Sequence, residues 1–346
     1  MILDGVYDMV DGLVCDMQEA IAAGNLNAKL GATDEELSRE ERAGLLSEFM
    51  ELRPLDGEPT LKYKACRGAS RTFAALATTL INLGTPVHGI GNLDGIEGGA
   101  IVTSNHFSPV DSTMFRKAAR RVGRTHVAVV SSEENLAMGG LFGFIIKYTD
   151  SIPISLDHRY LRDYFEPMLE RELDAGNFVI IYPEQEMWFN YTKPRPCKRG
   201  AYLYAARYGV PVIPCFVEVR GKEGLTRPNF VQVSYALHIL EPLYPDPALT
   251  ERQNSIEMAR KDYEQKVAAY EEATGRKLDY QFEAGDVAGW VPRAERQTTR
   301  PCAGAAAKSR VGQTGQDRSA TTGNHAPVRG CAQGFAQKKA ACPEQS

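Results

Sequence analysis

A histidine and an aspartate that could share a proton stand close together in residues 104–112, SNHFSPVDS, just after an apolar run. If the run is a strand and Asp111 lies in the first turn of the next helix, its carboxylate can bond one ring nitrogen of His106 while the other nitrogen faces a substrate. This predicts a general base that works near neutral pH. A helix capping box of Ser108, Pro109 and Asp111 is the alternative, and it leaves His106 unexplained.

Acidic side chains follow a second apolar run, in the sequence Tyr182-Pro-Glu-Gln-Glu-Met-Trp188. The carboxyl ends of parallel strands meet at one edge of a sheet, where α/β proteins build their sites. We therefore predict that Glu184, Gln185 and Glu186 contact a substrate beside His106, together with Asn105. A solvated loop with a capping glutamate is the alternative.

A basic segment follows the acidic one and leads into a helix that begins near Gly200. Cations at a helix N-terminus add to backbone N–H groups that already favour an anion, so a phosphate would fit there. A solvated basic loop is an equal alternative. The four cations of this predicted phosphate site are Lys193, Arg195, Lys198 and Arg199. A second basic group is typical of an ordinary exposed helix face: Arg116, Lys117, Arg120, Arg121 and Arg124.

Short β-branched runs alternate with helical patterns from residue 100 onwards, which predicts an α/β fold with a largely parallel or mixed sheet flanked by helices. The expected strands are 100–104, 126–130, 151–154, 178–182, 210–219 and 230–235. The clearest expected helices are 109–121, 160–175 with a kink at Pro167, 199–208 and 251–274.

We divide the chain into a helical N-terminal region at residues 1–97, a core at 98–245, a C-terminal helical extension at 246–292 and a disordered tail at 293–346. The helix expected at residues 70–83 carries one apolar stripe: Phe73, Leu76, Ala77, Leu80 and Ile81. We interpret this stripe as the side of the helix that covers the sheet, and a membrane-docking surface is the alternative.

The composition of the chain argues against several classes of function. The 346 residues carry a formal net charge of -4, which gives no general attraction to nucleic acid. The N-terminus has acidic residues inside its apolar stretch, so we expect no secretory signal, and no run of apolar residues is long enough to span a bilayer. The seven cysteines and six histidines show no ligand spacing, so we expect no metal and no bound cofactor.

The ordered series of Asn105-His106 with Asp111, Tyr-Pro-Glu184 and Val210-Pro-Val-Ile-Pro214 resembles the motifs of the phospholipid and glycerol acyltransferase superfamily. The resemblance covers residues 98–240. The motifs are similar in particular to those of the 1-acyl-sn-glycerol-3-phosphate acyltransferases. It implies that His106 and Asp111 are catalytic and that Glu184 contacts the acceptor. It also implies an acyl side lined by Val210, Pro211 and Pro214.

Two motifs depart from that family. The family's usual Pro-Glu-Gly-Thr-Arg is replaced by Pro-Glu-Gln-Glu-Met at residues 183–187. We expect this replacement to remove a tight turn, a hydroxyl group and a positive charge from the motif. The arginine of its second motif is replaced by Leu156, and the nearest cations are Lys147, His158 and Arg159. We infer that acyl transfer is retained, while phosphate recognition is either rebuilt through the basic segment at 193–199 or absent because the acceptor is not lysophosphatidate.

The resemblance leads us to expect an enzyme of phospholipid biosynthesis of a bacterial type, at the inner face of the cell membrane. It would move a fatty acyl group from an acyl-carrier protein or coenzyme A thioester to the hydroxyl of a lysolipid, in the first place 1-acyl-sn-glycerol-3-phosphate. The alternatives are a different lysolipid acceptor, an acyl thioesterase in which water replaces the acceptor, and a lipid-surface binding module without chemistry.

Overall fold

The computed structural model describes residues 4–31, 37–227 and 229–292, and these form one compact unit. The helical N-terminal region and the C-terminal helical extension are therefore parts of the same unit as the core. The tail that we expect to be disordered, residues 293–346, lies outside the described residues.

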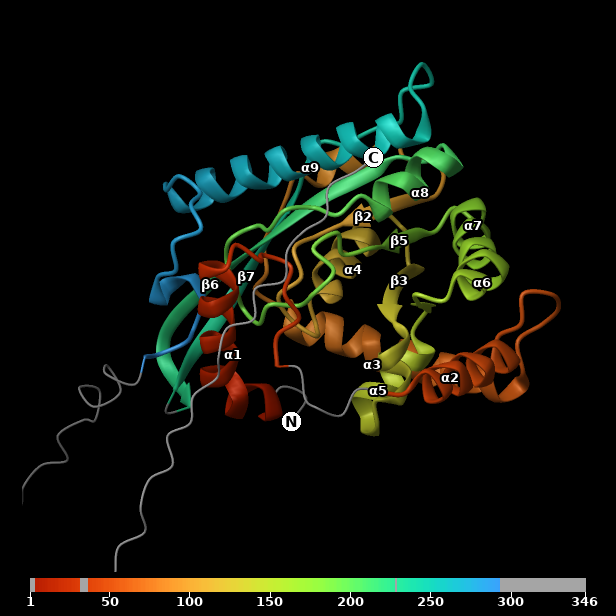
Figure 1. The fold of residues 1–346 in the computed structure, drawn as a ribbon, viewed down its shortest axis with the longest axis horizontal. Coiled ribbons are helices and arrows are strands. Elements are labelled where there is room, and N and C mark those ends of the chain that lie inside the picture. Colours follow the sequence, from red (N-terminus) through yellow and green to blue (C-terminus); the bar gives the residue numbers. More distant parts are fainter. Residues whose placement is uncertain (1–3, 32–36, 228, 293–346) are drawn as a thin grey trace, which may run out of the picture. The chain divides into compact units, whose positions relative to one another are not determined.

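A seven-stranded mixed sheet, in the order β1-β7-β6-β2-β5-β3-β4, forms the centre of the fold (Figure 1). Strands β2, β3, β4, β5 and β6 run parallel, while β7 pairs antiparallel with β6 and parallel with β1. The strand bounds are β1 Val87–His88, β2 Ala100–Thr103, β3 Val127–Ser132, β4 Ser151–Ile154, β5 Phe178–Ile180, β6 Val212–Arg227 and β7 Phe230–Ile239. The predicted fold class is confirmed.

Helices cover both faces of this sheet because its central strands are apolar on both sides. In β2, Ala100 and Val102 pack against α4 on one face, and Ile101 packs on the other face among residues of α7, α8 and α9. The helices are α1 Asp4–Ala22, α2 Arg39–Leu52, α3 Leu61–Ile81, α4 Ser112–Arg121, α5 Gly140–Tyr148, α6 His158–Tyr160, α7 Glu166–Asp174, α8 Gly200–Tyr208 and α9 Glu251–Thr274.

Local sequence explains where the structure departs from the expected elements. The helix expected at 160–175 is divided into α6, a π-helical turn at Leu161–Phe165 and α7, with Pro167 in the first turn of α7, where its missing N–H costs nothing. Helix α5 and the two-residue strand β1 were not expected. Strand β1 is too short to give a periodic signal.

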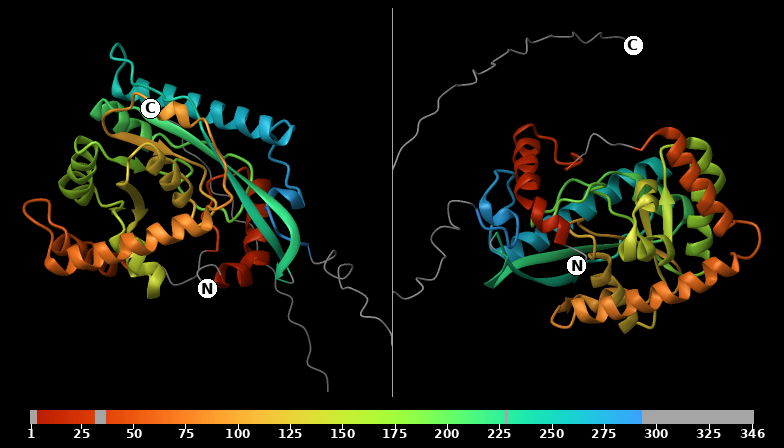
Figure 2. Two further views of the ribbon diagram at one scale, coloured as in Figure 1. Left: turned by 180° about the vertical axis from the view of Figure 1, so that it is seen from behind. Right: turned by 90° about the horizontal axis from the view of Figure 1, so that it is seen from below.

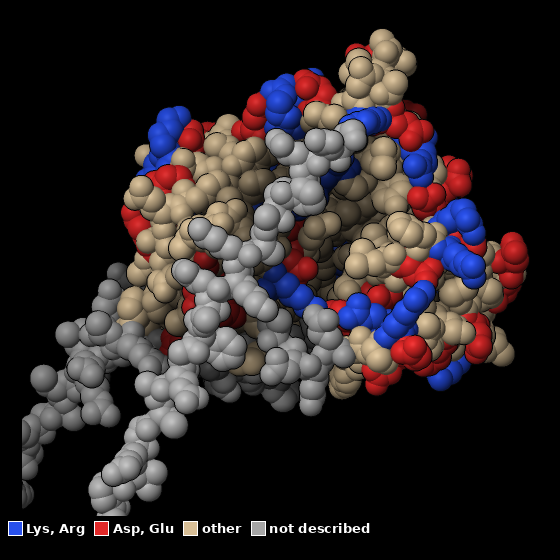
Figure 3. Space-filling model, viewed as in Figure 1, with Lys and Arg blue, Asp and Glu red and all other residues tan. Residues whose placement is uncertain are grey.

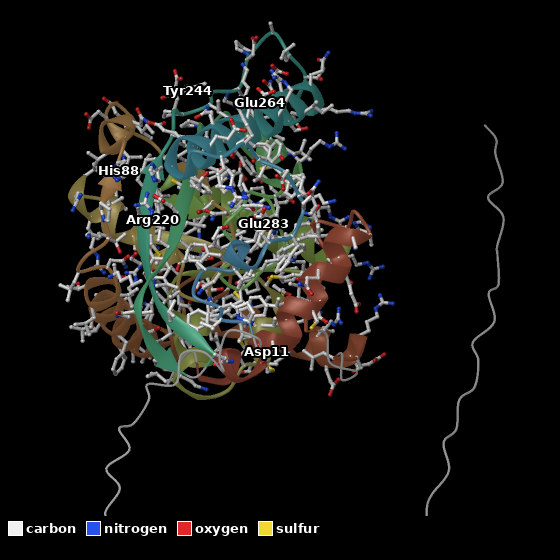
Figure 4. All side chains as sticks on the ribbon, turned by 90° about the vertical axis from the view of Figure 1, so that its left-hand side faces the viewer. Asp11, His88, Arg220, Tyr244, Glu264 and Glu283 are labelled. Carbon is white, nitrogen blue, oxygen red and sulfur yellow. The ribbon has the colours of Figure 1, made fainter. Side chains whose placement is uncertain are left out.

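The N-terminal helix α1 packs beside the loop that follows β5. Val10, Val14 and Met17 of α1 form a buried cluster with Trp188 and Phe189. Figure 4 shows Asp11 of α1 on the same side of the molecule as Glu283. The carboxylate of Asp11 accepts a hydrogen bond from the indole N–H of Trp290 at 2.8 Å. The N-terminal region therefore supports the segment that carries Glu184.

Helix α3 lies on the outside of the unit, where it packs against α4 and α5 (Figure 2). Its buried side is made by Tyr63, Ser70 and Thr78, so the stripe that we interpreted as covering the sheet faces outward. Phe73, Leu76 and Leu80 are 48%, 57% and 68% exposed. That interpretation was therefore wrong for these three residues. No helix among the described residues is long and apolar enough to span a membrane.

Candidate active site

His106 and Asp111 form a hydrogen-bonded pair at the carboxyl end of β2. Nδ1 of His106 lies 2.7 Å from Oδ2 of Asp111, and the Asp111 side chain is 4% exposed while that of His106 is 21% exposed. Within the described residues, no hydrogen bond occupies Nε2 of His106. The carboxylate therefore orients the imidazole and leaves its other nitrogen accessible to a substrate.

Tyr182 completes this arrangement, and the sequence reasoning missed it. Its hydroxyl donates to Oδ1 of Asp111, while its ring stacks on His106 with centroids 4.0 Å apart and planes at 16°. Burial, followed by the charge of Asp111, raises the pKa of Tyr182 well above its usual range, so the hydroxyl keeps its proton. The available signal was a tyrosine at the end of β5, directly before the Pro-Glu dipeptide.

The turn between β2 and α4 places the aspartate. Helix α4 begins at Ser112, and Asp111 stands at its N-cap position without capping α4 through its side chain. Oδ2 of Asp111 instead accepts weakly from the backbone N–H groups of Phe107 and Ser108, at 3.3 and 3.4 Å. Only half of the alternative capping box is therefore present, and the carboxylate has its closest contacts with the Tyr182 hydroxyl and the His106 ring.

Glu184 lies behind the pair and is held by a buried ion pair with Arg195. One oxygen of Glu184 accepts from the backbone N–H of His106 at 3.2 Å and from Nη2 of Arg195 at 2.9 Å. The other accepts from the backbone N–H of Arg195 at 2.9 Å. Both side chains are 3% exposed or less, and the guanidinium stacks on Trp188 at 4.6 Å.

Residues of the N-terminal region hold the same loop from outside. The side chain of Asn27 donates to the backbone oxygen of Glu184 at 3.1 Å. The Arg195 side chain donates to the backbone oxygen of Leu26 at 3.0 Å, and the Trp188 indole donates to the backbone oxygen of Ala28 at 2.9 Å. None of these contacts could be read from sequence, because the partners lie more than 150 positions apart.

Four of the predicted substrate contacts are used inside the protein, and Glu184, whose two carboxylate oxygens are bonded as described above, is the first of them. The Asn105 amide donates to and accepts from the backbone of Val217, at 3.0 and 2.8 Å. Lys193 is buried and pairs with Asp286 at 2.8 Å, while Arg195 pairs with Glu184. The expectation that Lys193 and Arg195 offer free cations to a phosphate is therefore corrected, since burying a charge without its partner costs too much.

The remaining predicted residues are divided between surface and interior. Gln185, Lys198 and Arg199 are exposed, and Glu186 is half-buried. Pro214 lies within β6 opposite Thr103, while Val210 and Pro211 precede that strand. Near the second motif, Lys147 pairs with Glu48 at 2.8 Å, whereas Leu156, His158 and Arg159 are exposed.

Gln185 keeps the tight turn that we expected to be lost. Its φ of 66° is in the left-handed region, which the family's glycine adopts freely and which costs other residues about 1 kcal/mol. We expect Gln185→Gly to raise the free energy of unfolding by about 0.5–1 kcal/mol and to leave turnover unchanged. Urea unfolding measures the first quantity. A urea midpoint of Gln185→Gly that is equal to or lower than that of the wild type would contradict this account of the turn.

The Tyr182 hydroxyl gives a second test of this geometry. Tyr182→Phe keeps the ring on His106 but removes a hydrogen bond to a charged group, worth about 1.5–3 kcal/mol. We expect kcat to fall about tenfold with little change in KM, because the bond fixes the carboxylate that stabilises the imidazolium. Tyr208→Phe, a half-buried tyrosine on α8, is the control. Equal turnover of both variants would remove Tyr182 from the site.

The arrangement as a whole suits proton transfer from a hydroxyl. A histidine with one nitrogen bonded to a buried carboxylate and the other accessible is the geometry of a general base. Among the residues at 4–31, 37–227 and 229–292, no group of three or more histidine, cysteine or acidic side chains is placed to bind a metal.

Comparison with known proteins agrees with the motif series. Residues 85–218 match the family model Acyltransferase. No curated protein matches the chain. Among solved structures, the chain is similar to the crystal structure of the 1-acyl-sn-glycerophosphate (LPA) acyltransferase PlsC from Thermotoga maritima, at 20% identity and a TM-score of 0.43, covering 68% of this chain and 90% of that one. The matched range contains His106, Asp111 and Glu184, so the candidate active site lies within the part of the chain that is similar to the Acyltransferase family.

Proposed function

We propose that the protein is a glycerolipid acyltransferase that moves a fatty acyl group from an acyl-carrier protein or coenzyme A thioester to the hydroxyl of 1-acyl-sn-glycerol-3-phosphate. The observation that carries this proposal is the His106–Asp111 pair, which Tyr182 braces inside the part of the chain that is similar to the Acyltransferase family. The acceptor and donor come from the motif resemblance.

The reaction is a direct displacement. Nε2 of His106 takes the proton of the acceptor hydroxyl as that oxygen attacks the thioester carbonyl. The carbon–sulfur bond then breaks, the new ester forms, and the imidazolium returns the proton to the leaving thiolate. Asp111 stabilises the imidazolium between the two proton transfers. No acyl-enzyme is needed.

The exposed stripe of α3 suggests how the enzyme meets its lipid. Phe73, Leu76, Leu80 and Leu83 are all at least 48% exposed, and Arg71, Arg120 and Arg121 lie on α3 and α4. An apolar stripe flanked by cations fits the surface of an anionic bilayer. We therefore place α3 on the membrane, at the inner face of the cell membrane.

A change of charge on the stripe tests this docking. We expect Leu76→Glu with Leu80→Glu to weaken binding to anionic vesicles at least tenfold, since each leucine buried in the membrane contributes about 1.5–3 kcal/mol. Ile256→Glu, on an exposed apolar residue of α9, is the control and should bind like the wild type. Co-sedimentation with vesicles measures this. Unchanged binding of the double variant would show that α3 is not the docking helix.

A substrate panel tests the proposed function. Purified protein is supplied with both thioesters and with lysolipids that differ in headgroup, and the products are identified by mass spectrometry. Phosphatidate as the main product supports the proposal. Transfer to another lysolipid overturns the acceptor, free fatty acid at the same rate with and without acceptor indicates the thioesterase, and vesicle binding without any turnover indicates the binding module.

A further inference from the structure

A pocket between α3 and α4 gathers arginines that the proposed reaction does not use. It has a volume of about 290 Å³ and is formed by α3, by α4 and by the segments that precede β3 and β4. Its charged lining consists of Arg71, Arg116, Arg120, His126 and Asp150.

One side of the pocket is a fixed network around Asp150. Its carboxylate accepts from Arg71 at 2.8 and 2.9 Å and from Arg67 at 2.9 Å, and Arg71 also lies 3.0 Å from Nε2 of His126. Burial raises the pKa of Asp150, but bonds from His126 and Arg71 outweigh it and hold that pKa well below its usual range. The carboxylate is therefore ionised and fixes these side chains in place.

The other side of the pocket carries cations without acidic partners. Arg120 donates only to the backbone oxygen of Ala75, at 3.3 Å. Within the described residues, Arg116 has no hydrogen bond or ion pair. Burial lowers the pKa of Arg116 from its usual range, and the nearby charge of Asp150 offsets only part of this effect. Arg67 and Arg71 thus contact the carboxylate of Asp150, Arg116 and Arg120 line the pocket beside it, and a second carboxylate, that of Glu172, lies 3.5 Å from Nε2 of His126.

Such an excess of positive charge suits a doubly charged anion. Guanidinium groups bind phosphate through paired N–H groups, and the bonds are strongest where water is excluded. The net charge of the chain gives no general attraction, and Figure 3 shows acidic and basic side chains mixed around one face of the molecule. The pocket is therefore a local feature and not part of a uniformly basic surface.

The position of the pocket indicates the source of the phosphate. Ala74 and Ala75 of α3 line it, and they adjoin Phe73 and Leu76 of the exposed stripe. Arg116 follows Asp111 by five residues on α4, which is about 7–8 Å along a helix. It also acts electrostatically on Tyr182. The pocket thus adjoins the proposed membrane surface at the amino ends of β3 and β4, whereas His106 and Asp111 follow the carboxyl end of β2.

We infer that this pocket binds the terminal phosphate of a phosphomonoester lipid, with Arg116 and Arg120 as its free cations and Arg71 and His126 as its fixed wall. The inference rests on the proposed function for the source of the phosphate, since such lipids would be acceptor and product.

The test compares vesicles of equal net charge, made of phosphatidylcholine with either phosphatidate or phosphatidylserine. We expect the wild type to prefer phosphatidate about tenfold, as one additional charge-assisted hydrogen bond would give. Arg116→Gln should abolish this preference. Arg121→Gln removes the same charge from an exposed position of α4 and should weaken binding to both vesicles equally, with the preference unchanged.

Other outcomes overturn the inference. If Arg116→Gln and Arg121→Gln behave alike, the attraction is a general effect of charge. If inorganic phosphate binds with the same dependence on Arg116 while the phosphatidate vesicles show no preference, the site takes free phosphate and the lipid source is wrong. The measurement needs no thioester, and His106→Ala should bind like the wild type. Failure here is thus separate from failure of the proposed reaction.

Discussion

Replacement of His106 with alanine is expected to lower kcat by about 10²–10⁴-fold, the usual contribution of a positioned general base. The fold should survive. The side chain is partly exposed, and its loss removes one ring contact with Tyr182, worth about 0.5–1.5 kcal/mol. Steady-state kinetics with a saturating thioester measures the first effect, and thermal unfolding measures the second.

His158→Ala is the matched control, because His158 is an exposed histidine that follows another strand of the same sheet. It should turn over like the wild type. Normal turnover by His106→Ala would end the general-base mechanism. An equal loss in both variants would show that the effect is not specific to the site.

The largest effect on stability is expected where the ion pair behind the site is broken. Arg195→Met leaves Glu184 charged and buried, and the loss of one partner of such a pair costs about 3–5 kcal/mol. The free energy of unfolding should fall by about that amount in urea. Turnover should fall as well, because Glu184 also accepts from the backbone of His106.

Two further variants separate the ion pair from simple loss of packing. The double variant Arg195→Met with Glu184→Gln should unfold at a higher urea concentration than Arg195→Met alone, since no unpaired charge remains. Arg260→Gln, which breaks an exposed pair on α9, should leave the midpoint unchanged. A double variant that is less stable than Arg195→Met would show that Glu184 does not depend on this arginine.

The sequence predicted the sheet and the contact between His106 and Asp111 well, because both are local patterns. The six expected strands follow from apolar runs, and His106 with Asp111 follows from a strand end and a helix start. Residue type and short spacing were sufficient there. The structure shows the predicted bond between Asp111 and the imidazole, and adds that the Asp111 side chain does not cap α4.

The same reasoning was less successful for cations, because partners distant in sequence decide which charges are free. Lys193 and Arg195 looked like anion ligands, but Asp286 and Glu184 neutralise both. Arg116 looked like an ordinary surface charge, but lines a pocket without a partner among the described residues. A run of basic residues therefore does not show which of them can meet a ligand.

Periodicity was similarly ambiguous for α3. The stripe of Phe73, Leu76 and Leu80 shows that one face is apolar, but it does not show whether that face meets the sheet or the outside. The opposite face is small and polar, with Ser70 and Thr78 buried against its neighbours. Small residues that permit close helix packing were the signal that could have reversed our interpretation.

The central claim is that His106 directs an acyl group to a lipid hydroxyl. The most direct measurement follows a labelled acyl thioester mixed with lysophosphatidate, and resolves acylated lipid from free fatty acid for the wild type and His106→Ala. The account predicts labelled phosphatidate from the wild type and almost none from the variant. Equal amounts of phosphatidate from both proteins, or free fatty acid as the main product of the wild type, would contradict it.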